Sequence, residues 1–199
     1  MKLLNIITGA AMIALTACGQ GDQVTTAKAE DVAVIETKLG KIVVALYEKD
    51  APKTSANFLK LAKEKFYDGT TFHRVIPGFM AQGGDPTSKD ASARSRHGTG
   101  GPGYTVEAEI KRDHKRGTLA TARTGDEVNP ERRSSGSQFF INVKDNSFLN
   151  GGYTVFGEVI AGMDVVDKIV AVPRDSRDNP NDPVTMKVTV MARDEALKK

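Results

Sequence analysis

Residues 72–85, FHRVIPGFMAQGGD, decide the fold of this chain of 199 residues. Before Pro77 it mixes large apolar residues with His73 and Arg74, a composition that predicts a short β-strand with two different faces. Pro77 ends the predicted strand, and a glycine-rich turn follows. The stretch brings one arginine, Arg74, together with large apolar groups and an amide in a small space. Such a surface suits a small uncharged ligand of about the size of proline.

Outward from this stretch, the pattern predicts many short strands and two helices. One helix opens at Pro52, a residue that the first turn of a helix tolerates, and carries an apolar stripe. Polar stretches at 87–99 and 125–135 are expected to be surface loops. The architecture indicated is mainly β, a closed antiparallel barrel capped at its ends by the helices. The predicted strands are 33–37, 41–47, 72–75, 118–122, 138–143, 153–159 and 184–190, and the second helix is 163–170.

The N-terminal residues predict export. Lys2 precedes an apolar stretch at 3–17, which has the length of a signal peptide core. That stretch ends in Leu-Thr-Ala-Cys, which resembles the bacterial lipobox. Cys18 is the one cysteine of the chain and has no disulfide partner, so a lipidated N-terminus is favoured over a buried core thiol.

Together with the pattern of strands and helices, this predicts a signal peptide at 1–17, a lipidated Cys18 with a tether to residue 31, a folded domain at 32–193 and a tail at 194–199. The protein is expected in the bacterial cell envelope, anchored by lipid to a membrane and facing the periplasm or the cell exterior. The choice between inner and outer membrane stays open.

Composition and motifs argue against several function classes. A net charge of +3 is slight, and the basic residues at 111–116 have no interleaved aromatics, so nucleic-acid binding is not expected. The glycines at 98–103 match the dinucleotide fingerprint in letters, but no apolar strand precedes them. The three histidines are scattered without ligand spacing, so neither a metal nor a cofactor is expected. A hydrolase using Ser137 is a weak alternative, because no nucleophile-elbow motif surrounds that residue.

Three further blocks, together with residues 72–85, resemble the cyclophilin family of peptidyl-prolyl cis–trans isomerases. They are TLATAR at 118–123, GSQFFI at 136–141 and FLNGGYTVFG at 148–157, in the family's order. The similarity extends from about residue 32 to 192. It implies a closed eight-stranded antiparallel β-barrel with two capping α-helices. It also implies an enzyme that accelerates X–Pro rotation in proline-containing polypeptide substrates, in this case during the folding of exported proteins.

The resemblance also implies the roles of individual residues. Arg74 would be the catalytic donor to the nitrogen of the twisting amide, with Gln82 orienting it or holding the substrate backbone. Arg123 is expected to be partly exposed. Phe148 stands where cyclosporin-sensitive relatives carry tryptophan. The residues expected to contact substrate are His73, Phe79, Met80, Gln82, Ala122, Arg123, Gln138, Phe140, Phe148, Leu149 and Tyr153.

Two hypotheses stay open beside a working isomerase. One is a proline-peptide-binding or holdase module with little turnover, although a pure binder would not need Arg74. The other is the Ser137 hydrolase. The chain is expected to act as a monomer, and its client proteins are not specified by the sequence.

Overall fold

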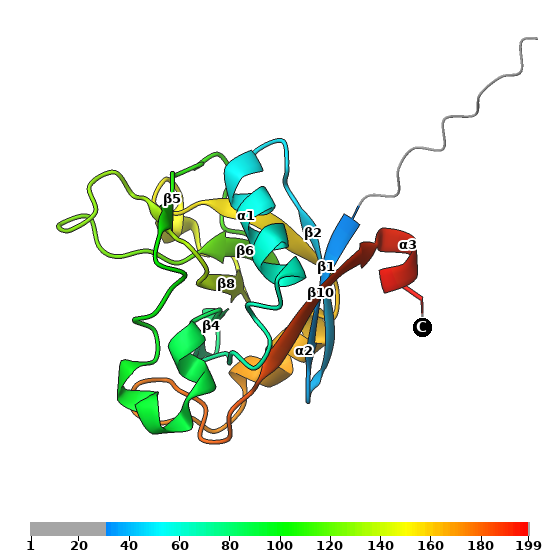
Figure 1. Ribbon diagram of the computed structural model, residues 1–199, viewed down its shortest axis with the longest axis vertical. Helices are drawn as coiled ribbons and strands as arrows, with labels where there is room; N and C mark the ends of the chain where they lie inside the picture. Colours follow the sequence, from blue (N-terminus) through cyan, green and yellow to red (C-terminus); the bar gives the residue numbers. More distant parts are fainter. Residues whose placement is uncertain (1–30, 199) are drawn as a thin grey trace, which may run out of the picture.

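The computed structural model describes residues 31–198, which form one barrel-like body with short helices around it (Figure 1). The predicted signal peptide, the predicted lipid site at Cys18 and most of the predicted tether fall in residues 1–30, which lie outside the described part of the chain. The elements in chain order are β1 (Asp31–Thr37), β2 (Gly40–Leu46), α1 (Pro52–Lys63), β3 (Arg74–Ile76), β4 (Met80–Gly83), the 3₁₀ helices η1 (Pro86–Lys89) and η2 (Ala91–Arg96), β5 (Thr105–Val106), β6 (Thr118–Thr121), β7 (Ser134–Ser135), β8 (Phe139–Asn142), the 3₁₀ helix η3 (Ser147–Leu149), β9 (Val155–Ala161), α2 (Met163–Val170), β10 (Met186–Ala192) and α3 (Arg193–Ala196).

Eight strands form a single antiparallel sheet in the order β10-β1-β2-β9-β6-β8-β4-β3. The sheet curls so that the residues just before β3 reach β10 at the other edge. There the Gly69 N–H donates to the Met186 carbonyl at 2.9 Å, and the Phe72 N–H donates to the Val184 carbonyl at 3.0 Å. The prediction of a mainly β, eight-stranded antiparallel fold is therefore confirmed. The short strands β5 and β7 pair separately beside the barrel.

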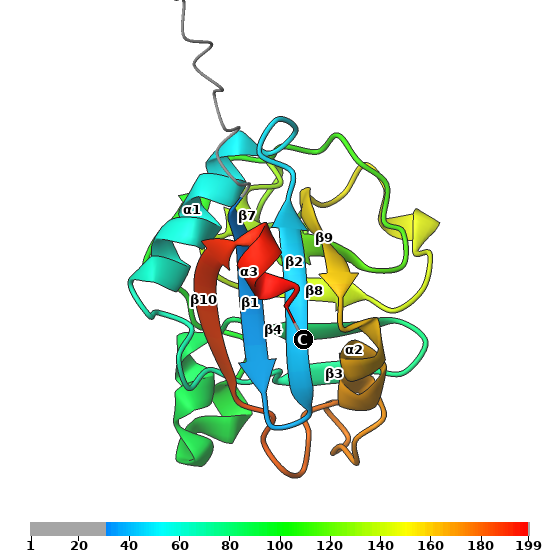
Figure 2. The same cartoon turned by 90° about the vertical axis from the view of Figure 1, so that its right-hand side faces the viewer.

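The barrel interior is filled by aromatic rings. Phe139 of β8 meets Phe58 of α1 edge to face, with ring centroids 5.6 Å apart, and makes similar contacts with Tyr67 and Phe72. These rings are buried, and edge-to-face packing is a favourable arrangement for them. Helices α1 and α2 lie at opposite ends of the barrel, as predicted for the two capping helices (Figure 2).

A short C-terminal helix covers part of the outside of the sheet. The residues predicted as a tail include most of α3, whose Ala196 is fully buried with Val32, Val34 and Val43. The Lys41 ammonium donates to the Ala196 carbonyl at 2.8 Å and fixes the helix to β2. The sequence did not predict this helix, because a segment of four residues is too short to show a helical period.

Several boundaries differ from the sequence-based expectation. The glycine-rich turn contains a strand, β4, which pairs with β3 and β8. Position 83 of this strand favours glycine, because a Cβ there would come within 2.6 Å of the Met186 side chain. The polar stretch expected as a loop at 87–99 holds η1 and η2, each capped by an aspartate side chain, Asp85 or Asp90.

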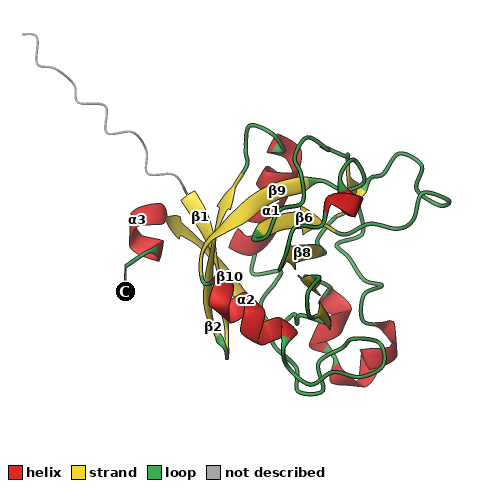
Figure 3. Cartoon of the chain, turned by 180° about the vertical axis from the view of Figure 1, so that it is seen from behind, coloured by secondary structure: helices red, strands yellow, loops and turns green. Residues whose placement is uncertain are grey.

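The loops gather on one side of the molecule. Seen from behind, the long green segments lie on the side away from α3 (Figure 3). Among residues 31–198, every helix is too short or too polar to cross a bilayer. The side with the loops also carries the candidate site.

Candidate active site

Strand register places the key side chains in one row across four strands. Arg74 of β3 pairs with Gln82 of β4, Gln82 with Phe140 of β8, and Phe140 with Ala120 of β6. Directly opposed residues point to the same face of an antiparallel sheet. Their chain neighbours, such as Ile141, point into the core. The row therefore lies on the outer face of the barrel.

Beside this row is a small pocket of about 130 Å³, roughly the space of four water molecules. Its floor is formed by Met80 and Phe140, which are nearly fully buried in a cluster separate from the main core. The backbone of Phe79 is held in place, because its carbonyl accepts a hydrogen bond from the Asn146 side-chain amide at 3.0 Å. The pocket is lined by Arg74, Phe79, Met80, Gln82, Ala122, Arg123, Phe140, Leu149 and Tyr153.

The structure thus brings together nine of the sequence-predicted site residues in one pocket. Gln138 lies next to it, in an adjoining cavity. Phe148 is 71 % exposed and packs beside Phe79, with ring centroids 5.6 Å apart, without lining the pocket. His73 is buried and lines neither cavity. Their individual roles toward substrate stay predictions.

The Arg74 guanidinium is available to a ligand. Its side chain is 44 % exposed, and its Nε lies 4.0 Å from Asp178 Oδ2. The same carboxylate accepts a hydrogen bond from Arg174 Nε at 3.1 Å. Within residues 31–198 no hydrogen bond occupies the two terminal NH₂ groups of Arg74. A permanently charged double donor therefore faces a pocket whose floor, Met80 and Phe140, is apolar.

A chain of amides holds Gln82 in position. Gln82 Nε2 donates to Gln138 Oε1 at 3.0 Å, and Gln138 Nε2 donates to the carbonyls of Gly98 and Gly100 at 2.9 and 2.8 Å. The Gln82 amide oxygen stays free of partners in the described chain. It can accept a hydrogen bond from Arg74 or from a peptide N–H.

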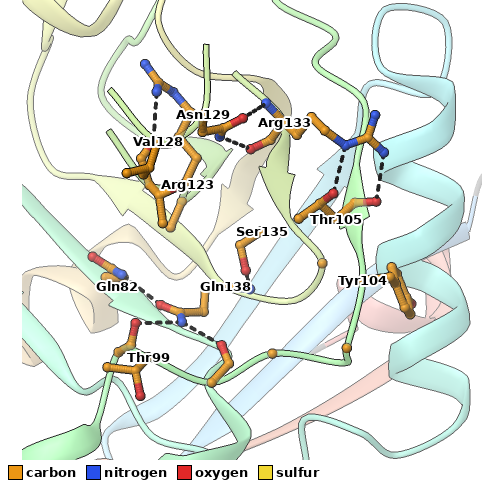
Figure 4. A pocket seen from close by; sticks show the side chains of 17 residues that line it. Gln82, Thr99, Tyr104, Thr105, Arg123, Val128, Asn129, Arg133, Ser135 and Gln138 are labelled. Atoms are coloured by element: carbon orange, nitrogen blue, oxygen red, sulfur yellow. Dashed lines mark hydrogen bonds between the residues drawn. The ribbon is translucent and has the colours of Figure 1, made fainter. Parts of the chain in front are cut away.

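A second, larger cavity of about 820 Å³ adjoins the small pocket and shares Gln82, Ala122 and Arg123 with it. Figure 4 shows its walls, with the Gln82–Gln138 hydrogen bond on one side and Tyr104 on the other. Glycines at 98, 100, 101, 103 and 136 form much of the surface. Backbone groups are accessible along such a surface, which suits a bound peptide segment.

Arg123 is more enclosed than the sequence suggested. Its side chain is only 7 % exposed, because its guanidinium lies over the Tyr153 ring at 4.7 Å and pairs with Asp126. Its Nε also donates to the Gly152 carbonyl at 2.7 Å. Sequence reasoning missed Asp126, since it lies in a segment without a recognisable motif.

His73 gives the protein a pH-dependent stability. Burial lowers the pKa of His73 to about 4, with smaller opposing and supporting effects from Asp85, His97 and Arg74. In the unfolded chain its pKa is about 6.5, so the unfolded state binds the proton first as the pH falls. The contribution of neutral His73 to the stability of the folded state is complete above pH 6.5, and it is lost as the pH falls toward 4.

We therefore expect the free energy of unfolding to drop by about 2 kcal/mol between pH 7 and pH 5 through this residue. Urea denaturation at both pH values measures it. His114 shifts in the same direction, so the comparison is between wild type and His73→Gln, which should lose much of the difference. Parallel pH profiles for the two proteins would contradict this assignment.

The family profile of cyclophilin-type peptidyl-prolyl cis–trans isomerases matches residues 32–190. A peptidyl-prolyl cis–trans isomerase of Acinetobacter baylyi is 48 % identical over 153 residues, covering 74 % of this chain and 76 % of the relative. Isomerase B of Bacillus subtilis is 47 % identical over 127 residues, covering 62 % and 79 %.

Solved structures agree. A cyclophilin-type isomerase of Cryptosporidium parvum superposes with a TM-score of 0.73 at 31 % identity, covering 82 % of this chain and 98 % of that one. A second crystal structure of that protein was determined in the presence of the dipeptide Ala-Pro. The chain belongs to the cyclophilin-type peptidyl-prolyl cis–trans isomerase family, and it is an enzyme of that activity.

Proposed function

We propose that the small pocket binds proline and that Arg74 catalyses rotation about the preceding peptide bond. The observation that carries this proposal is the pair of unoccupied NH₂ groups on Arg74 beside a pocket with an apolar floor. Rotation must break amide resonance, which sets a barrier of about 18–20 kcal/mol. The twisted amide nitrogen gains a lone pair, and a fixed guanidinium can donate to it.

No proton needs to be transferred and no bond is broken in this mechanism. The guanidinium stays charged at all physiological pH values, so it donates without a change of protonation. A donor fixed in place before the reaction stabilises the twisted state more than the planar one. Phe79, Met80 and Phe140 hold the ring of proline, and Gln82 holds the adjoining backbone.

A protease-coupled assay tests the proposal on the soluble form that begins after Cys18. The protease cleaves only the trans peptide, so the rate at which the cis fraction disappears measures isomerisation. We expect clear acceleration with a proline peptide. Tight peptide binding without acceleration would instead support the binding or holdase function. Labelling of Ser137 by a serine-directed probe would support the hydrolase.

We further propose that the enzyme works on exported proteins, fixed to a membrane by lipid on Cys18. The described chain begins at β1 next to α3, on the opposite side of the molecule from the loops that surround the larger cavity (Figure 1). An anchor leaving from that side keeps the site open to polypeptides. This geometry supports the proposal without depending on the predicted signal peptide.

Mass spectrometry of the native protein checks the anchor. We expect the mature N-terminus at Cys18 with a thioether-linked diacylglycerol and an acylated amine. A Cys18→Ser variant should lose the lipid and appear in the soluble fraction while keeping its isomerase activity. Mature material that still begins with Met1 would disprove the anchor.

A further inference from the structure

Residues 125–135, between β6 and β7, form one wall of the larger cavity. Val128, Asn129, Arg133 and Ser135 all line it, and Val128 is 77 % exposed at its rim (Figure 4). The wall belongs to a segment with little regular structure, so its position depends on how its side chains are fastened.

One acidic side chain fastens the wall on the side of the proline pocket. Asp126 Oδ1 lies 2.6 Å from Arg123 Nη1, and its Oδ2 lies 3.1 Å from Arg132 Nη2. Each arginine reaches across to the loop after η3. Arg123 Nε donates to the Gly152 carbonyl at 2.7 Å, and Arg132 Nη1 donates to the Gly151 carbonyl at 2.6 Å.

The far end of the wall is fastened independently. Asn129 accepts from the Arg133 N–H at 2.9 Å and donates to the Arg133 carbonyl at 2.8 Å. Arg133 Nε donates to the Thr105 hydroxyl at 2.7 Å, which ties the segment to β5. Loss of Asp126 would therefore free one end of the wall and leave the other end in place.

Backbone strain lies between the two attachments. Arg132 has a φ of +53°, a left-handed conformation that non-glycine residues adopt only where their surroundings impose it. Its two side-chain bonds, to Asp126 and to Gly151, supply that constraint. Without Asp126, Arg132 would lose one of the two side-chain bonds that hold its backbone in the left-handed conformation.

We propose that Asp126 is a positioning residue that sets how the enzyme accepts the part of the polypeptide that precedes the proline. The inference rests on the proposed function of the small pocket. The two cavities share Gln82, Ala122 and Arg123, so a peptide with proline in the small pocket continues past Arg123 into the larger cavity. Asp126 touches neither cavity, but it holds the arginine at their boundary and the wall beyond.

The electrostatics agree with this role. Arg123 lowers the pKa of Asp126, mainly by a side-chain hydrogen bond, so the carboxylate is charged at neutral pH. Arg123 keeps its bonds to Gly152 and Thr124 when Asp126 is removed. The proline pocket should therefore survive the substitution, whereas the wall of the larger cavity should move.

The test compares a capped Ala-Pro dipeptide, which fills only the proline pocket, with a peptide carrying four more residues before the alanine. Exchange spectroscopy by NMR gives kcat and KM for both. For Asp126→Ala we expect KM of the longer peptide to rise about three- to fivefold, with kcat unchanged and both constants unchanged for the dipeptide. Asp126→Glu should restore most of the affinity.

Glu127→Ala is the matched control, because this neighbouring acid makes none of these contacts, and it should behave as wild type. Arg132→Ala should reproduce the Asp126 effect, and the double variant should add little to either single change. Equal effects on both peptides, or no effect on either, would overturn the proposal. Absence of turnover in wild type would refute the proposed function instead, and binding of the two peptides, followed by chemical shifts, would still test the role of Asp126.

Discussion

Replacement of Arg74 by alanine is expected to lower kcat/KM for a proline peptide by about 100-fold or more. Removal of one preorganised donor to a transition state typically costs a factor of about 10² to 10³ in kcat. Arg74 is the donor that the row across β3, β4 and β8 aims at the pocket, and no other residue of that row carries a charge. The loss should appear mainly in kcat, because Phe79, Met80 and Phe140 still bind the proline ring.

The protein should stay folded without Arg74. The side chain is 44 % exposed, and its ion-pair contact, to Asp178, is long at 4.0 Å. Exposed pairs of this kind contribute at most about 1 kcal/mol, so the melting temperature should change by only a few degrees. Arg96→Ala, at an exposed arginine of η2 away from the pocket, is the control and should leave turnover unchanged.

Arg74→Lys separates charge from geometry. Lysine keeps the positive charge but replaces the planar fork with a single ammonium on a flexible stem. We expect it to recover only a small part of the lost activity. The protease-coupled assay that shows wild-type turnover also measures these variants. Full activity of Arg74→Ala in that assay would rule out the guanidinium mechanism.

Most of the fold could be predicted because its signals are local. The hairpin of β1 and β2, the Pro52 start of α1 and the bounds of α2 follow from alternation, turn glycine and helical spacing. Strand β4 was not predicted, because it ends in Gly83 and lies between Gly78 and Gly84, and this many glycines indicated a turn. The Asp85 and Asp90 caps of η1 and η2 are local signals too. Because aspartate is a preferred N-cap residue, the sequence around them could also have predicted these short helices.

The candidate site likewise has one part that the sequence predicted and another part that only the fold brings together. Residues 72–85 are contiguous, so one stretch of sequence supplies both Arg74 and much of its pocket. The resemblance to a known family supplied Phe140, Leu149 and Tyr153, which are far from that stretch in the chain. Asp126 and Asp85 act through partners that lie near them only in the folded state. No spacing rule connects Asp126 with Gly151, which lie in separate loops and are joined through Arg132, so their link could not be read from the sequence.

Asp85→Ala is expected to be the most destabilising of the substitutions considered. Asp85 is fully buried, and its carboxylate accepts the Thr87 N–H and hydroxyl, each at 2.7 Å, and the Gly98 N–H. Alanine would leave the partly buried N–H groups of Thr87 and Gly98 without this acceptor, next to a space that the buried carboxylate had filled. A cost of about 3 kcal/mol follows, which corresponds to a fall in melting temperature of roughly 10 °C.

The pKa of Asp85 also indicates that its charged carboxylate stabilises the fold. Burial alone would raise it, but the hydrogen bonds from Thr87 and from the backbone N–H groups of Gly98 and Gly100 outweigh that effect and lower it. A lowered pKa in the folded state means that the carboxylate stabilises the fold above its ordinary pKa of 3.8. That stabilisation is lost as the pH falls through the folded-state value. The difference in stability between wild type and Asp85→Ala should therefore shrink in strong acid.

Asp85→Ala should also weaken catalysis, because the carboxylate holds the loop that positions the amide chain. Gly98 and Gly100 are bound to Asp85 through their N–H groups, and their carbonyls accept from Gln138, which in turn holds Gln82. A looser loop leaves Gln82 less well oriented toward the peptide backbone. We expect kcat/KM to fall by about tenfold, mainly through KM, at a temperature where the variant is still folded.

Two variants separate the buried carboxylate from helix capping in general. Asp90→Ala removes a comparable cap, bonded to the Ser92 N–H at 2.8 Å, but this cap is exposed and has no link to Gly98 or Gly100. It should cost about 1 kcal/mol and leave KM unchanged. Asp85→Asn should not rescue the fold, because its NH₂ group would face N–H donors. Equal stability losses for Asp85→Ala and Asp90→Ala, with KM unchanged in both, would mean that Asp85 only caps η1 and that the amide chain is held by the strands alone.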